Sequence, residues 1–196
     1  MSQKSGSDSI FTPELMKIIK IFGLISIGLV LVLSFFNTKR ASNTEANPIF
    51  RMPDSNRLYF LNIRAIDYDI EIRTDAKLSL YRNDSRAISD EAPTVDFVII
   101  LNKGKDEAYL YLEPKNADWP LRLKVQEGNN EQTFEFQNGN KSTFYDYLEK
   151  LQPWLSGDSQ FQLMTKNGWV KIWENPSEKQ AIKTTLEDFY RLINQD

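Results

Sequence analysis

A chain of 196 residues that is 41% hydrophobic and 26% charged has the size and composition of one folded domain with attachments. It contains no cysteine and no histidine, which excludes disulfides, imidazole catalysis and the metal sites that these residues build. The formal net charge is −3 and no basic run follows residue 56, so a nucleic-acid partner is not expected.

The first strong signal along the chain is an apolar segment. Residues 21–36, IFGLISIGLVLVLSFF, carry no charge, and Thr12, Pro13 and Glu14 upstream are typical of a helix start. We predict a short tail over residues 1–12 and a single transmembrane helix over residues 13–36, in contact with the lipid bilayer. A cleaved signal peptide would be shorter, and a buried core helix would be amphipathic.

The charges that flank this helix do not decide its orientation in the membrane. Three basic residues precede the apolar run and three follow it before residue 57, so the positive-inside count is tied. A short N-terminal tail ahead of one span most simply stays in the cytoplasm. We therefore expect the C-terminal domain on the extracytoplasmic, periplasmic side rather than the reverse.

A polar linker is expected between the apolar helix and the folded domain. Residues 37–56 have no hydrophobic period and contain Pro48 and Pro53. The remaining residues, 57–196, are predicted to form a soluble α+β domain.

The first part of this domain has the composition of successive β-strands. Residues 95–101, VDFVIIL, are apolar on both faces, which predicts a central strand. The polar residues 102–106 and 127–131 are typical of hairpin loops. The predicted strands cover residues 57–64, 66–73, 77–82, 95–101, 107–114, 121–125 and 133–137.

The stretch 66–73, IDYDIEIR, alternates without a break. Ile66, Tyr68, Ile70 and Ile72 are predicted to face the core, with Ile70 opposite Leu80 and Ile72 opposite Leu78. The acidic residues 67, 69 and 71 project from the other face. Neighbours on one face of a strand are roughly 6.6 Å apart, too far to converge on one ion, so we predict a solvated face and no metal site.

The second part of the domain changes period. Residues 142–155 carry one apolar stripe and a cap signature at Thr143, which predicts a helix. Residues 160–174 alternate around Asn167-Gly168, which predicts a hairpin. The last predicted helix has Pro176 at its first position, a capping box at Ser177 and a stripe of Ile182, Leu186, Phe189 and Ile193. The fold class is therefore α+β, a mostly antiparallel sheet that ends in helix, β-hairpin and helix.

The candidate site is aromatic rather than catalytic. In the hairpin, alternation places Phe161, Leu163, Val170 and Ile172 on one face, which is core. The opposite face, together with two tyrosines of strand 107–114, forms a possible interaction patch if no helix covers it. The patch residues are Met164, Trp169, Trp173, Tyr109 and Tyr111.

These observations favour a non-enzymatic, single-pass membrane protein. Its extracytoplasmic domain would mediate protein–protein interaction as an accessory or assembly subunit of a membrane or envelope complex. A tethered sensor that binds a sugar or cell-wall fragment is the alternative, and a carboxylate-dependent hydrolase is the least favoured. We expect no catalytic residues, no cofactor and no metal, and the sequence leaves the oligomeric state and the partner open.

Overall fold

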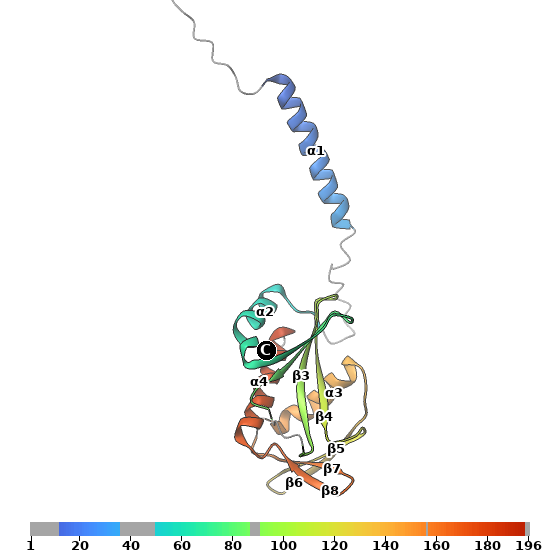
Figure 1. Ribbon diagram of the computed structural model, residues 1–196, viewed down its shortest axis with the longest axis vertical. Coiled ribbons are helices and arrows are strands. Elements are labelled where there is room, and N and C mark those ends of the chain that lie inside the picture. The colour runs from blue at the N-terminus through green and yellow to red at the C-terminus, as the bar shows by residue number, and fades with distance from the viewer. Residues whose placement is uncertain (1–11, 36–49, 87–90, 156, 195–196) are drawn as a thin grey trace, which may run out of the picture. The chain divides into compact units, whose positions relative to one another are not determined.

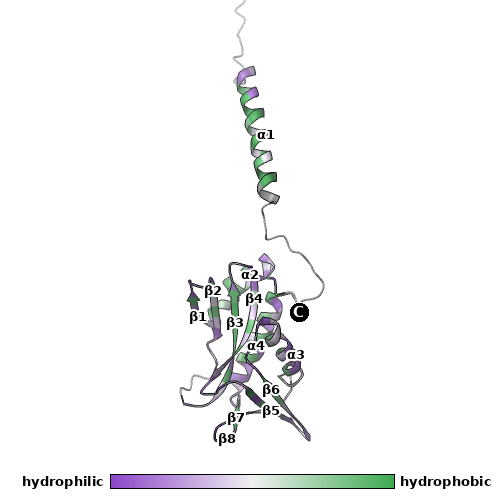
Figure 2. Ribbon diagram, turned by 90° about the vertical axis from the view of Figure 1, so that its right-hand side faces the viewer, coloured by the Kyte–Doolittle hydropathy of each residue, from purple (hydrophilic) through white to green (hydrophobic). Residues whose placement is uncertain are grey.

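The computed structural model describes residues 12–35, 50–86, 91–155 and 157–194 (Figure 1). The chain divides into two units, Met1–Thr44 and Glu45–Asp196. In the first unit, helix α1 (Pro13–Phe35) carries hydrophobic residues along its length (Figure 2), and its large apolar side chains from Leu15 to Val30 are exposed, as is that of Val32. Among the described residues, no helix meets the combined requirement of length and hydropathy for a membrane span. The predicted tail before Thr12 and Phe36 lie outside the described residues.

The second unit is an α+β domain with two antiparallel four-stranded sheets. Sheet A has the strand order β1–β2–β3–β4, and sheet B has the order β6–β5–β7–β8. The elements of the unit are α2 (Asp54–Tyr59), η1 (Phe60–Arg64), η2 (Ala65–Asp67), β1 (Tyr68–Arg73), β2 (Leu78–Asn83), β3 (Thr94–Asn102), β4 (Glu107–Lys115), β5 (Leu121–Glu127), β6 (Asn130–Phe136), α3 (Lys141–Leu155), β7 (Gln160–Thr165), β8 (Gly168–Ile172) and α4 (Pro176–Leu192).

The domain begins earlier than residue 57. Phe50 and Met52, which the sequence placed in the linker, are buried in the core. The Phe50 carbonyl accepts a hydrogen bond from the Ala108 amide at 2.8 Å, and the Met52 amide donates to the Asp106 carbonyl at 2.9 Å. This short segment therefore extends sheet A along β4. Residues 37–49 of the predicted linker lie outside the described residues.

The stretch predicted as a first strand, residues 57–64, is helical instead. It forms the second half of α2 and all of the π-helical turn η1, and the 3₁₀ turn η2 follows before β1 begins at Tyr68. Phe60 holds this helical segment against sheet A, because its buried ring packs against Tyr68 and Tyr81 at centroid distances of 5.5 and 5.1 Å. Arg64 adds an ion pair to Asp188 of α4, with Nε and Oδ1 2.9 Å apart. Tertiary contacts at two side chains thus override the apparent strand pattern.

Sheet A confirms the predicted central strand and corrects the predicted register of β1. β3 lies between β2 and β4, and every residue from Thr94 to Ile99 is buried. β1 pairs with β2 so that Ile70 opposes Tyr81 and Ile72 opposes Ser79, one residue away from the predicted partners. The error comes from the turn, because Arg73 and Leu78 still belong to the paired strands.

Sheet B contains the two other predicted hairpins. β5 and β6 are joined through Gly128, whose φ of +58° lies in the left-handed region that glycine tolerates. The β7–β8 register pairs Phe161 with Ile172 and Leu163 with Val170, which confirms that the four share a face; the first three are buried and Val170 is half-buried. The turn itself occupies residues 166–167, because Thr165 pairs with Gly168, one residue earlier than predicted.

Helices α3 and α4 pack against the sheets and close one hydrophobic core. α4 lies along sheet A (Figure 1), and the ring of Phe144 in α3 is 5.1 Å from that of Tyr111 in β4. The predicted stripe of α4 is confirmed, since all four of its apolar residues are buried. Both predicted caps are displaced. Asn140, not Thr143, accepts backbone hydrogen bonds at the start of α3, and Asn175, not Ser177, is the N-cap of α4.

Candidate functional site

Trp173, the central residue of the predicted aromatic patch, belongs to the core. Its side chain is 2% exposed, its indole N–H donates to the Val95 carbonyl at 3.0 Å, and its ring lies 4.8 Å from that of Phe161. The residue follows β8 with a φ of +57°, a conformation that costs a bulky side chain roughly 1–3 kcal/mol. This backbone turn breaks the alternation of the strand, so Ile172 and Trp173 are both buried. The placement of Trp173 on an outer face was therefore wrong.

Met164 and Trp169 do share the outer face of sheet B. They oppose each other in the β7–β8 register, and both are half-buried. The Nζ atom of Lys124 lies 4.8 Å from the centre of the Trp169 ring, so a cation covers part of the indole. These two residues remain a small aromatic and thioether surface, and their role in binding stays a prediction.

Tyr109 and Tyr111 pack beneath other side chains rather than beside Trp169. Tyr111 contacts Phe144 of α3, and Tyr109 lies at the edge of the Phe50 ring at 6.0 Å. The Tyr109 hydroxyl donates to Glu107, which also accepts from Lys141 Nζ at 2.9 Å. Burial and this carboxylate raise the pKa of Tyr109 to about 12. The five predicted residues therefore do not form one patch.

The acidic row that runs from η2 into β1 is divided among four arginines. Asp67 accepts from Arg64 at 2.9 Å and Asp69 from Arg86 at 2.7 Å, while Glu71 accepts from Arg82 at 2.9 Å and from Arg73 at 3.4 Å. The carboxylates project to separate partners and remain substantially exposed. Within the described residues, no group of three or more acidic side chains is placed to hold a metal ion. The row acts as a charged surface, as its spacing predicts.

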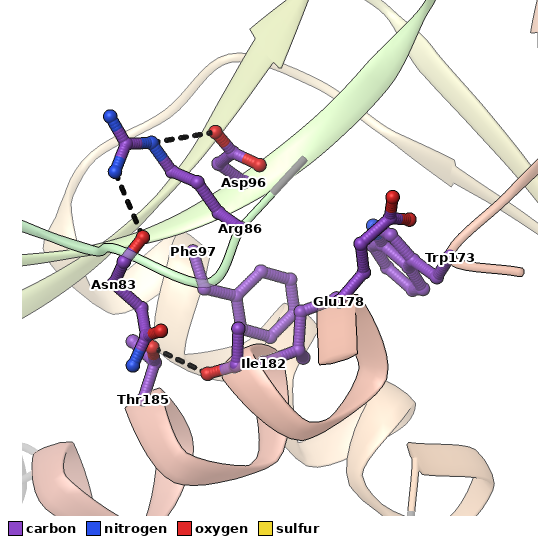
Figure 3. A pocket seen from close by; sticks show the side chains of 9 residues that line it. Asn83, Arg86, Asp96, Phe97, Trp173, Glu178, Ile182 and Thr185 are labelled. Atoms are coloured by element: carbon purple, nitrogen blue, oxygen red, sulfur yellow. Dashed lines mark hydrogen bonds and ion pairs between the residues drawn. The ribbon is translucent and has the colours of Figure 1, made fainter. Parts of the chain in front are cut away.

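A small pocket lies between the end of β2, the start of β3 and the first turns of α4 (Figure 3). Asp96 of β3 is 5% exposed, and its Oδ2 atom lies 2.7 Å from Lys115 Nζ and 3.7 Å from Arg86 Nε. Arg86 also donates to the Asn83 carbonyl at 2.8 Å, and Glu178 projects from the first turns of α4. Strand ends and a helix start thus bring acidic and basic side chains together around Phe97 and Trp173.

The pocket raises two carboxyl pKa values without offering room for a substrate. Burial raises the pKa of Asp96, against the opposing effect of Lys115. Burial and the nearby charges of Asp96 and Glu174 raise the pKa of Glu178. Paired carboxyl groups with raised pKa are a pattern found at catalytic sites. Yet the hollow measures about 10 Å³, which is room for roughly one water molecule. The arrangement therefore places a buried carboxylate beside two basic side chains in a hollow of this size.

The largest concentration of exposed apolar side chains in the domain follows the helical segment into β1. Phe60 covers Tyr81, the partner of Ile70 on β2, so the helical segment lies over the same face of sheet A that carries Ile70. Ile66 is 85% exposed and Ile72 is 62% exposed. We call this set the apolar surface: Leu58, Leu61, Ile63, Ile66, Ile70 and Ile72.

Sequence reasoning assigned half of this surface to the core. It predicted that Ile66, Ile70 and Ile72 would be buried beside Tyr68, but only Tyr68 is. The alternation was correct for residues 68–73. What it could not give is the position of β1 as the terminal strand of sheet A. The sequence does show that one face of this strand is apolar, but it does not show which element covers that face. That open question is the signal that could have marked the face as a candidate surface.

The chain was compared with protein families, curated proteins and solved structures. None of the three comparisons finds a match. The function is therefore inferred from the residues and the geometry described above.

Proposed function

We propose that this protein is a non-enzymatic, single-pass membrane protein whose α+β domain binds a protein partner in a membrane complex. The apolar surface is the observation that supports this proposal. Exposed isoleucines are common singly, but a group of apolar side chains concentrated along one segment is characteristic of an interaction site. The small size of the pocket at Asp96 and the absence of histidine and cysteine favour binding over catalysis.

The proposed anchor is α1 together with the apolar residues that follow it. Residues 21–36 contain no charged side chain, and the exposed apolar residues of α1 occur on all sides of the helix. Lipid would remove these side chains from water, with a gain of roughly 25 cal/mol for each Å² of apolar surface buried. We further propose that the domain lies on the extracytoplasmic side of this membrane.

The test is capture of the tagged full-length protein from its native membranes in mild detergent, followed by mass spectrometry. We expect the protein to remain with membranes during an alkaline carbonate wash and then to elute with a stoichiometric partner. The double variant Ile63→Ser with Ile66→Ser should lose the partner without losing the membrane. Lys166→Ser, at an exposed hairpin position, is the matched control and should retain both.

Two results would contradict the proposal at different points. Release of the wild-type protein into the carbonate supernatant would remove the anchor. Elution of the wild-type protein without a stoichiometric partner, or full retention of the partner by the double serine variant, would remove the proposed role of the apolar surface.

A further inference from the structure

The outer edge of β1 is a terminal edge of sheet A. β1 pairs with β2 on one side and is the terminal strand of sheet A. Its register with β2 runs from Tyr68 to Arg73 without a bulge. The strand contains no proline and no lysine, two devices that commonly protect edge strands. Within the part of the chain that the structure describes, its outward backbone amides and carbonyls have no strand partner.

The side chains of this edge are apolar on one face and charged on the other. Ile70 and Ile72 are 51% and 62% exposed on the face shared with Tyr81. Asp69, Glu71 and Arg73 alternate with them on the opposite face. A strand that carries both charge signs at a spacing of four residues can be complementary to an antiparallel copy of itself.

We propose that β1 pairs antiparallel with β1 of a second copy of this chain, so that two sheets A join into one eight-stranded sheet. With the two-fold axis at Glu71, Asp69 lies opposite Arg73 of the second copy, and this pair occurs twice. Within one chain Asp69 is paired with Arg86 at 2.7 Å, and Arg73 lies 3.4 Å from Glu71, so the new pairs extend these contacts across the strand edge. Ile70 then lies opposite Ile72 of the second copy, also twice, on the face that each copy alone leaves in water. Cross-strand pairs of opposite charge and of β-branched residues are both stabilising.

Charge and the length of the overlap together favour this register over its neighbours. An axis at Ile70 would place Asp69 opposite Glu71 of the second copy, two repulsive pairs. An axis at Ile72 would also oppose Glu71 and Arg73, but it would pair only three residues of each β1. In the register centred on Glu71, the two Glu71 carboxylates face each other, but each already accepts a hydrogen bond from Arg82 of its own chain at 2.9 Å. That arginine offsets their repulsion.

The pairing uses few residues, so the fraction of chains that are paired depends on their local concentration. Two copies held in one bilayer meet at a much higher effective concentration than two copies in solution. This part of the inference rests on the proposed anchor. The strand pairing itself does not, since it follows from the edge of β1.

Disulfide cross-linking tests the register directly, because the chain contains no native cysteine. Full-length Glu71→Cys in native membranes, treated with a mild oxidant, should run mostly as a dimer on a non-reducing gel. Directly opposed residues have Cβ atoms about 4.5–5.5 Å apart, close to disulfide geometry. Glu135→Cys is the matched control, because Glu135 lies on the edge strand β6, has a similar exposure and is also paired with an arginine. It should remain largely monomeric.

A second measurement leaves β1 without a cysteine. Light scattering of the wild-type protein in detergent, at a concentration that saturates dimer formation, should give twice the monomer mass after the detergent is subtracted. Ile70→Thr with Ile72→Thr should return the monomer mass, since threonine keeps the strand preference but removes the apolar contact. A monomeric wild type at saturating concentration, or cross-linking of Glu71→Cys no greater than that of Glu135→Cys, would overturn the inference. Neither result affects partner capture through Ile63 and Ile66, so failure of one proposal is distinguishable from failure of the other.

Discussion

At the scale of single residues, buried polar and strained side chains set the local structure. Trp173 takes up a left-handed backbone conformation because its indole fills the core next to Phe97 and Phe161. The gain from burying an aromatic side chain outweighs a strain of roughly 1–3 kcal/mol. Alternation along β8 ends at this residue, so the chain can turn towards α4.

Asp96 shows the opposite balance, since its burial destabilises the folded domain. Its pKa is raised by burial, so the folded state binds a proton more readily than the unfolded chain. The destabilisation is therefore fully present above the raised pKa, and it disappears as the pH falls below the ordinary carboxyl pKa of about 3.9. Asp96→Asn should raise the free energy of unfolding at neutral pH and have little effect in acid, as measured by denaturant unfolding across pH.

Asp118→Asn is the control for this experiment. The side chain of Asp118 is 83% exposed, so its replacement should leave the pH profile unchanged. A loss of stability in Asp96→Asn at neutral pH would mean that the ion pair with Lys115 outweighs the cost of burial, contrary to the prediction.

At the scale of elements, asparagine caps define where the helices begin. Asn175 accepts a hydrogen bond from the Ser177 amide at 3.0 Å and another from the Ser177 hydroxyl at 2.9 Å. Pro176 then occupies the first turn, where its missing N–H has no cost. The cap directs α4 back along sheet A from the strained turn at Trp173.

Loss of this cap should weaken the domain by a modest and specific amount. Asn175→Ala is expected to lower the free energy of unfolding by about 1 kcal/mol, because the amide and the hydroxyl of Ser177 both lose their acceptor. Ser177→Ala removes only the hydroxyl and should cost clearly less. Thermal unfolding of both variants checks the order. A larger loss in Ser177→Ala would restore Ser177 as the cap that its sequence position indicates.

At the scale of the whole domain, two sheets share one core. Ile99 of sheet A, Leu123 of sheet B, Leu148 of α3 and Phe189 of α4 are all fully buried members of a single hydrophobic cluster. A cluster that crosses both sheets couples their stability. The domain should therefore unfold as one cooperative unit.

A core substitution in one sheet should consequently weaken the other. Leu123→Ala leaves a cavity in sheet B and should destabilise the domain by about 2–5 kcal/mol. Hydrogen exchange of the full-length protein should then become faster in β3 of sheet A as well as in β5. Unchanged protection of β3 would show that the sheets open separately.

The sequence alone predicted what depends on local periodicity. The interior position of β3, the strand faces of β7 and β8 and the buried stripe of α4 all follow from the spacing of apolar residues, because each side chain's direction is set by its own backbone. The exposed acidic row of β1 follows for the same reason.

The tertiary structure decided what depends on neighbours distant in sequence. Residues 57–64 are helical because Phe60 and Arg64 find partners on β2 and α4. Ile70 and Ile72 have the same alternation as buried strand residues, yet they are exposed because β1 is the last strand of its sheet. Periodicity gives the face on which a side chain lies, but burial depends on what covers that face. For this reason, a strand face that was predicted to be core is part of the exposed apolar surface. Both the partner-binding proposal and the strand-pairing proposal rest on that exposure.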